Sequence, residues 1–103
     1  MRHLKNIHPG EVLKEEFLDP MGISVYRLSK ETGLPQTRLG QIIRGERSIT
    51  AETALKIGRY LNTGPEFWMN LQALYDIEEA ERRHNKELKT IHPYREAAAA
   101  AEE

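Results

Sequence analysis

Apolar residues recur at steps of three and four positions along most of the chain, with polar residues between them. This periodicity is typical of helices that bury one face, and no stretch alternates polar and apolar residues for long enough to predict a strand. We therefore predict an all-α fold, in which a compact five-helix domain spans residues 8–77. Residues 1–7 are expected to form an N-terminal arm, and residues 78–103 a charged helical extension with a mobile tail.

The first predicted helix covers residues 9–18, because proline is favoured in the first turn of a helix and Pro9 stands there. Its apolar face consists of Val12, Leu13, Phe17 and Leu18. Residues 19–22 include Pro20 and Gly22, which are typical helix-ending residues. We expect the helix to end before them.

Two short helices are predicted next, over residues 25–32 and 35–44. Ser24 is a good N-cap for the first, and Gly33 suits the left-handed conformation that often follows a helix end. Two short helices joined by a tight turn are the arrangement with which a helix-turn-helix places its second helix in the major groove.

The inner faces of these two helices are expected to meet in the core through Leu28 and Leu39, with the small Ser29 allowing close approach. Polar side chains then project from the first turns of the second helix. We predict that they read base edges in the major groove, and they are Gln36, Thr37, Arg38 and Gln41. The alternative for these residues is a solvated polar face, but the cap, the small residue, the turn glycine and the second helix together favour DNA.

Phosphate contacts are predicted beside this helix, where they would fix the register of the protein without reading sequence. The residues assigned to them are Ser24, Arg44, Arg47 and Ser48. For Arg44 or Arg47 taken singly, an ordinary surface charge is an equal alternative.

A fourth helix is predicted over residues 51–61 after the cap Thr50. Thr63 and Glu66 have the spacing of a capping box for a fifth helix that continues past Ile77. The apolar band of this helix contains Phe67, Trp68, Leu71, Leu74 and Tyr75. We predict a homodimer interface at Trp68, Leu71 and Tyr75, because a two-fold dimer presents two recognition helices to two half-sites. Core packing is the alternative; it is favoured for Phe67 and equally open for Trp68 and Tyr75.

The formal net charge of −1 argues at first against a nucleic-acid partner. The charges are unevenly distributed, however: residues 24–59 contain seven Lys and Arg against three Glu, whereas acidic residues crowd the chain after residue 75. No cysteine is present, which excludes disulfides and thiolate metal sites and fits a reducing cytoplasm. Without an apolar leader or a long apolar run, we expect a cytoplasmic protein that does not enter a membrane.

Catalytic chemistry is not expected from this sequence. The four histidines, at positions 3, 8, 84 and 92, lack the three- or four-residue spacing that pairs two imidazoles on a helix. The acidic pairs at 15–16 and 78–79 are typical of solvated helix surfaces, and no glycine-rich phosphate loop follows a strand. We therefore predict no metal site, no cofactor and no enzyme activity.

Three motifs in order resemble the HigA antitoxins, members of the phage-repressor-like helix-turn-helix superfamily that are sometimes called virulence-associated protein I. The resemblance covers about residues 7–80 and rests on the segments 8–18, 45–50 and 67–76. Ser29 and Gly40 depart mildly from the family pattern, and the part beyond Ile77 varies among relatives.

This resemblance implies an antitoxin of a type II toxin-antitoxin system. Such a protein would be a homodimer that binds an operator palindrome in double-stranded DNA, represses its own operon and neutralises a HigB-like mRNA endoribonuclease. Two alternatives remain open at this point. The chain could be a stand-alone transcriptional regulator without a toxin, or a protein-interaction module whose helix-turn-helix has lost DNA binding.

Overall fold

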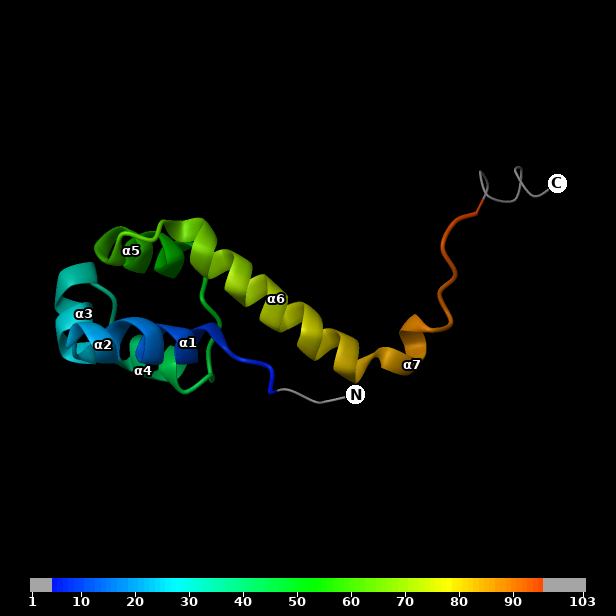
Figure 1. Ribbon diagram of the computed structural model, residues 1–103, viewed down its shortest axis with the longest axis horizontal. Helices are drawn as coiled ribbons and strands as arrows, with labels where there is room; N and C mark the ends of the chain where they lie inside the picture. The colour runs from blue at the N-terminus through cyan, green and yellow to red at the C-terminus, as the bar shows by residue number, and fades with distance from the viewer. Residues whose placement is uncertain (1–4, 96–103) are drawn as a thin grey trace.

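The computed structural model describes residues 5–95, and every regular element within them is a helix, as predicted. The elements in chain order are α1 (Pro9–Val12), η1 (Leu13–Leu18), α2 (Asp19–Met21), α3 (Val25–Thr32), α4 (Gln36–Ile43), α5 (Ala51–Leu61), α6 (Pro65–Arg83) and α7 (Asn85–Leu88). Figure 1 shows that α1 to α5 gather into one lobe, from which the long α6 runs outwards to α7. Within residues 5–95, no helix has the length and hydrophobicity needed to cross a membrane.

The first helical segment is longer than predicted, because α1, η1 and α2 follow one another without a break as far as Met21. Its middle part, η1, has wider π-helical turns, and the N–H of Asp19 donates to the carbonyl of Lys14, five residues back. A proline ring crowds the carbonyl four residues before it in an ordinary α-helix. The wider turns relieve this crowding at Pro20, and the helix ends at Gly22 with a φ of 67°.

The core lies where the inner faces of the lobe helices meet α6. Its fully buried apolar side chains include Leu13, Leu28, Leu39, Ile42, Ile57 and Trp68. Removing side chains of this size from water contributes about 1.5–3 kcal/mol each to folding. The predicted anchors Leu28 and Leu39 are confirmed as core residues.

Trp68 is a core residue, so its predicted place in a dimer interface is wrong. Its side chain is 0% exposed, its ring packs against Phe17 at 5.2 Å and Phe67 at 4.9 Å between centroids, and its indole N–H donates to Thr63 Oγ1 at 2.8 Å. Phe67, predicted to be core, is instead 38% exposed. The predicted capping box is also absent, because the Thr63 hydroxyl serves Trp68 and the N-cap of α6 is Gly64.

The residue before α1 caps this helix and also contacts α6. His8 caps α1 with its Nδ1 atom, which accepts a hydrogen bond from the N–H of Gly10 at 2.8 Å, and its ring meets the Tyr75 ring of α6 edge-on at 4.8 Å. Burial lowers the pKa of the His8 imidazole, against the opposing influence of Asp76. The neutral ring can therefore keep its acceptor nitrogen.

Helix α6 continues past residue 77, as predicted, so the expected domain boundary falls inside a helix. All side chains from residue 81 to residue 95 are exposed. Asn6, in the expected N-terminal arm, is attached to this helix: its side-chain amide donates to the carbonyl of Tyr75 at 3.1 Å and to Glu79 Oε2 at 3.0 Å. The predicted mobile tail falls largely on residues 96–103, which lie outside the described part of the chain.

Gly10 provides a direct test of how α1 packs on α4. A Cβ atom at Gly10 would lie 1.8 Å from the backbone oxygen of Ile42, so α1 could approach α4 this closely only without a side chain. We predict that Gly10→Ala lowers the free energy of unfolding by about 3 kcal/mol, measured by urea denaturation.

Gly40→Ala is the matched control, because its Cβ would meet only the flexible end of the Arg44 side chain, at 3.2 Å. Alanine has the higher helix propensity, so this variant should be neutral or more stable by up to about 1 kcal/mol. Equal stability of the two variants would contradict the described contact between α1 and α4.

Candidate nucleic-acid interface

The turn between α3 and α4 is held by hydrogen bonds from the helix that precedes it. Ser24 caps α3 by accepting from the N–H of Arg27 at 3.0 Å, and Gly33 ends α3 with a φ of 78°. The hydroxyl of Ser29 donates to the carbonyl of Leu34, whose side chain is 1% exposed. The short turn therefore has both a hydrogen-bonded backbone and an apolar anchor, which fixes α4 relative to α3.

Helix α4 has one buried face and one face open to solvent. Leu39 and Ile42 are both 0% exposed, whereas Gln36 and Thr37 are exposed. The other two predicted base-reading residues, Arg38 and Gln41, are half-buried. None of the four is enclosed by the described part of the chain, so the outer face of α4 is free to meet a ligand.

The Arg38 side chain has a partner on the next helix. Its Nη1 atom lies 3.4 Å from Glu52 Oε1 in α5, and the arginine side chain keeps only 27% of its surface exposed. Glu52 also pairs with Lys56, at 2.9 Å. The hydrogen bond from Lys56 and the charges of Lys56 and Arg38 lower the pKa of the Glu52 carboxyl. Glu52 was not among the residues predicted from sequence to belong to the site.

The loop after α4 carries three of the predicted phosphate-contacting residues, Arg44, Arg47 and Ser48, and all three are exposed. Arg44 is paired with Glu46 at 3.2 Å. Arg47 and Ser48 border a hollow of about 140 Å³ beside α4. The other residues that line the hollow are Arg38, Thr50, Glu52 and Thr53.

Gln72 of α6 holds this loop in place, a role that the sequence prediction missed. The side chain is 4% exposed, and its Oε1 atom accepts from the N–H of Ile49 at 2.8 Å. Its Nε2 atom donates to Asp76 Oδ1 at 2.9 Å and to the hydroxyl of Ser48 at 3.4 Å. Both polar atoms of this buried side chain are hydrogen-bonded, so Gln72 fixes the position of Ser48 relative to α6.

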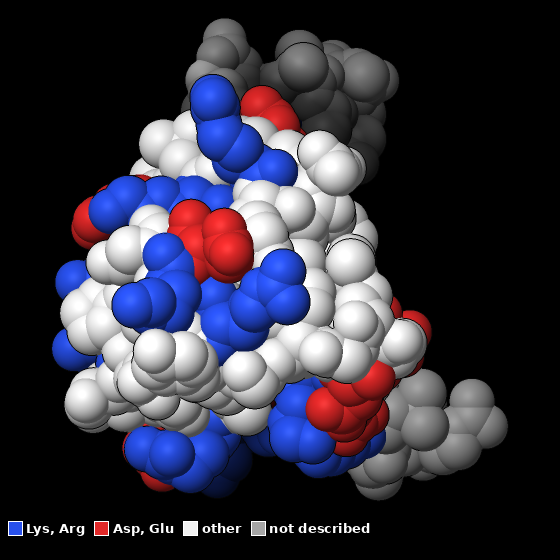
Figure 2. All heavy atoms as spheres, turned by 90° about the vertical axis from the view of Figure 1, so that its left-hand side faces the viewer, with Lys and Arg blue, Asp and Glu red and all other residues white. Residues whose placement is uncertain are grey.

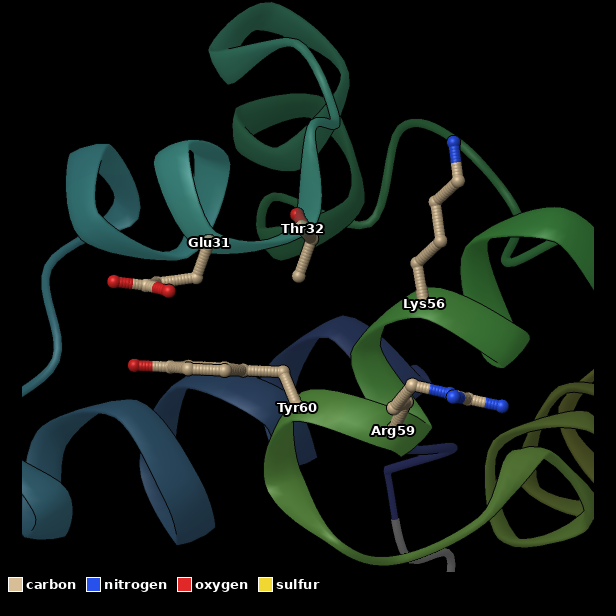
Figure 3. Close-up of a pocket in the computed structure, with 5 residues that line it drawn as sticks. All are labelled: Glu31, Thr32, Lys56, Arg59 and Tyr60. Carbon is tan, nitrogen blue, oxygen red and sulfur yellow. The ribbon is translucent and has the colours of Figure 1, made fainter.

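The surface charges follow the uneven distribution in the sequence. Figure 2, which faces the end of the lobe, shows Lys and Arg side chains spread over this end with smaller acidic groups between them. A second, larger hollow of about 380 Å³ opens between α3 and α5. Figure 3 shows Glu31 and Tyr60 extending side by side there, with Lys56 and Arg59 on the α5 side. Each of the two hollows is lined by two basic side chains and one glutamate, but only the hollow beside α4 contains residues of the recognition helix and of the loop that follows it.

Of the other predicted dimer residues, Leu71 and Tyr75 are half-buried. Two apolar residues on the same helix are far more open: Leu74 is 65% exposed and Ile77 is 55% exposed. Within residues 5–95, no three acidic or histidine side chains come together in a way that could hold a metal ion.

Comparison with known proteins gives a consistent result. The helix-turn-helix family model matches residues 13–68. Virulence-associated protein I of Dichelobacter nodosus is 45% identical over 76 residues, which cover 74% of this chain and 70% of that protein. Antitoxin HigA-1 of Vibrio cholerae is 37% identical over 84 residues, which cover 82% of this chain and 79% of that protein.

The fold is likewise similar to a solved structure described as the Pseudomonas aeruginosa antitoxin HigA with the higBA promoter. The TM-score is 0.82 at 37% sequence identity, and the match covers 86% of this chain and 98% of that chain. These three relatives are named as antitoxins or as a virulence-associated protein and not as enzymes, in agreement with the prediction of a non-enzymatic protein.

Replacing Gln72 by leucine should release the loop after α4. The buried N–H of Ile49 would lose its acceptor, which costs about 1–3 kcal/mol of unfolding free energy. We expect urea denaturation to show this loss and hydrogen exchange to show faster exchange of the Ile49 amide. Asn70→Leu is the control, since Asn70 is exposed on the same helix and should change stability by less than about 0.5 kcal/mol. Unaltered Ile49 exchange in Gln72→Leu would rule out the anchoring role.

Proposed function

Since the chain belongs to the HigA family of helix-turn-helix antitoxins, we propose that it represses its own operon as a homodimer bound to an operator palindrome and neutralises a HigB-like mRNA endoribonuclease. The observation that carries the DNA part of this proposal is the division of α4 into a buried face and an open polar face. That division supports insertion of the helix into the major groove.

Base reading is assigned to the four polar residues of α4. Glutamine pairs naturally with adenine, arginine with guanine, and the threonine methyl group with the methyl group of thymine. We therefore assign direct base contacts to Gln36, Thr37, Arg38 and Gln41. Arg38 has to leave Glu52, at least in part, in order to make its contact.

Phosphate contacts are assigned to the residues on either side of the recognition helix. Ser24 stands at the N-terminus of α3, where a helix end favours an anion. Arg44, Arg47 and Ser48 lie on the exposed loop beyond α4. These contacts would fix the position of the protein on the duplex without selecting a sequence.

A two-fold dimer is proposed to form through α6. The half-buried Leu71 and Tyr75 remain in the proposed interface, and the exposed Leu74 and Ile77 replace the buried Trp68. Apolar side chains this exposed lose unfavourable contact with water when a second copy covers them. The two α4 helices would then face half-sites about one helical turn apart.

Toxin binding is assigned by charge to the acidic part of α6. An mRNA endoribonuclease needs a positive surface to bind RNA phosphates, and an acidic antitoxin surface complements such a surface. The acidic side chains on this part of the helix are Asp76, Glu78, Glu79 and Glu81.

Co-expression tests the toxin part of the proposal. The tagged chain is produced together with the small open reading frame next to its gene, and we expect the two proteins to purify as a complex that lacks ribonuclease activity. A neighbouring product that does not co-purify, together with intact operator binding, would favour the stand-alone regulator instead.

The division between base-reading and phosphate contacts is tested with alanine variants. Arg38→Ala and Gln41→Ala should each lower operator affinity by about 1–3 kcal/mol and relax the choice of base at one position. Arg47→Ala should weaken binding to operator and unrelated duplexes about equally. Fluorescence anisotropy at fixed salt measures both affinities, with the exposed Arg83→Ala in α6 as control. If Arg38→Ala leaves operator affinity unchanged, the assigned orientation of α4 is wrong.

The dimer surface is tested by placing a charge in it. Leu74→Glu should raise the dimer dissociation constant at least about tenfold, because an unpaired charge would be buried between two copies. Sedimentation equilibrium measures this, and Leu88→Glu, at a residue 46% exposed on α7, is the control. A Leu74→Glu variant that dimerises like the unmodified chain would place the interface elsewhere.

A further inference from the structure

We propose that Glu52 is a positioning residue that sets the sequence specificity of Arg38, by holding its guanidinium away from phosphates until a matching base is met. This inference rests on the proposed function, in which Arg38 reads a base. The sequence pattern alone assigns no role in DNA recognition to Glu52.

The geometry of the pair restricts Arg38 more than the neighbouring pair restricts Arg44. Glu52 lies in the first turn of α5, and its Oε1 atom is 3.4 Å from Arg38 Nη1 on the recognition helix. The Arg38 side chain is 27% exposed, against 59% for Arg44, whose partner Glu46 is only two residues away on the same loop. Of these two pairs, only Arg38–Glu52 connects two helices.

Lys56 keeps the Glu52 carboxylate in place. Lys56 lies one turn further along α5, and its Nζ atom is 2.9 Å from the second carboxylate oxygen, Oε2. Both oxygens of Glu52 thus have a cationic partner, one on its own helix and one on α4. The carboxylate can therefore remain oriented towards Arg38 without swinging into solvent.

Competing phosphate positions lie close to this pair. Arg38 and Glu52 line the same hollow as Arg47 and Ser48, which are assigned to phosphate contacts. Without Glu52, the Arg38 guanidinium could bind a phosphate in this region on any duplex. Such a contact would add affinity without adding specificity.

Arg38 has three possible contacts, with Glu52, with a phosphate and with guanine, and their relative strengths explain why it would select the base. An exposed ion pair is weak and comparable with a single exposed phosphate contact, so Arg38 gains little by exchanging Glu52 for a phosphate. A bidentate contact with guanine is stronger than the ion pair, so Arg38 leaves Glu52 when this base is present. Specificity here comes from an interaction that competes with the wrong partner as well as from the contact with the right one.

Glu52→Gln tests this proposal, because glutamine keeps the size of the side chain and removes its charge. Two duplexes of about 30 base pairs are used: the segment upstream of the reading frame protected in footprinting, and a shuffled version of it. We expect Glu52→Gln to bind the shuffled duplex more tightly and to lower the ratio of the two affinities by roughly two- to fivefold. In a set of single base-pair changes, it should relax the preference at the same position as Arg38→Ala.

Two comparisons separate positioning from a general effect of charge. Glu46→Gln removes an equally exposed carboxylate that also pairs with an arginine; each glutamate side chain is 57% exposed. It should tighten binding to both duplexes and leave their ratio unchanged. When Arg38→Ala is already present, adding Glu52→Gln should likewise leave the ratio at the value of Arg38→Ala alone. Thermal unfolding should show that all variants fold.

The proposal is overturned if Glu52→Gln keeps the ratio of the unmodified chain, or if it alters the ratio equally in the Arg38→Ala background. These results would leave the proposed DNA-binding function intact. An unmodified chain that binds the two duplexes with the same affinity would instead overturn that function, and the role of Glu52 with it.

Discussion

The orientation of α4 depends on the burial of Leu39 and Ile42, because a helix with two fully covered apolar side chains on one face has to turn its opposite face outwards. The backbone of α1 contributes to this constraint, since Gly10 approaches the carbonyl of Ile42 so closely that a Cβ atom would not fit between the two helices. The interface around α4 is therefore a consequence of core packing. Its polar residues need no special conformation to reach solvent.

Helix α6 links the other parts of the molecule to this interface. Trp68 fills the core, Gln72 fixes the loop after α4, and Tyr75 contacts the cap of α1. The exposed Leu74 and Ile77 lie on the same helix, on either side of Tyr75 in the sequence. A dimer formed through these residues would be connected by α6 to the loop that we assign to phosphate contacts, so that α6 would set the distance between the two α4 helices.

Local sequence signals predicted much of this structure, because caps and turns depend on neighbouring residues. Ser24, Gly33 and Thr50 mark helix boundaries that the structure confirms. The features that were missed depend on contacts distant in sequence. The burial of Trp68 involves a ring contact with Phe17, far earlier in the chain, and the role of Gln72 involves a backbone N–H 23 positions away. The partnership of Arg38 with Glu52 likewise required the relative placement of two helices.

The central claim is that the outer face of α4 meets DNA, and nuclear magnetic resonance of the ¹⁵N-labelled chain tests it most directly. The chain is titrated with a duplex that carries the sequence upstream of its reading frame. We expect the largest signal changes at the side-chain amides of Gln36 and Gln41 and at the backbone amides of residues 44–48, with α7 unaffected. Large changes confined to α6 and α7, with unaltered signals in α4, would contradict the account.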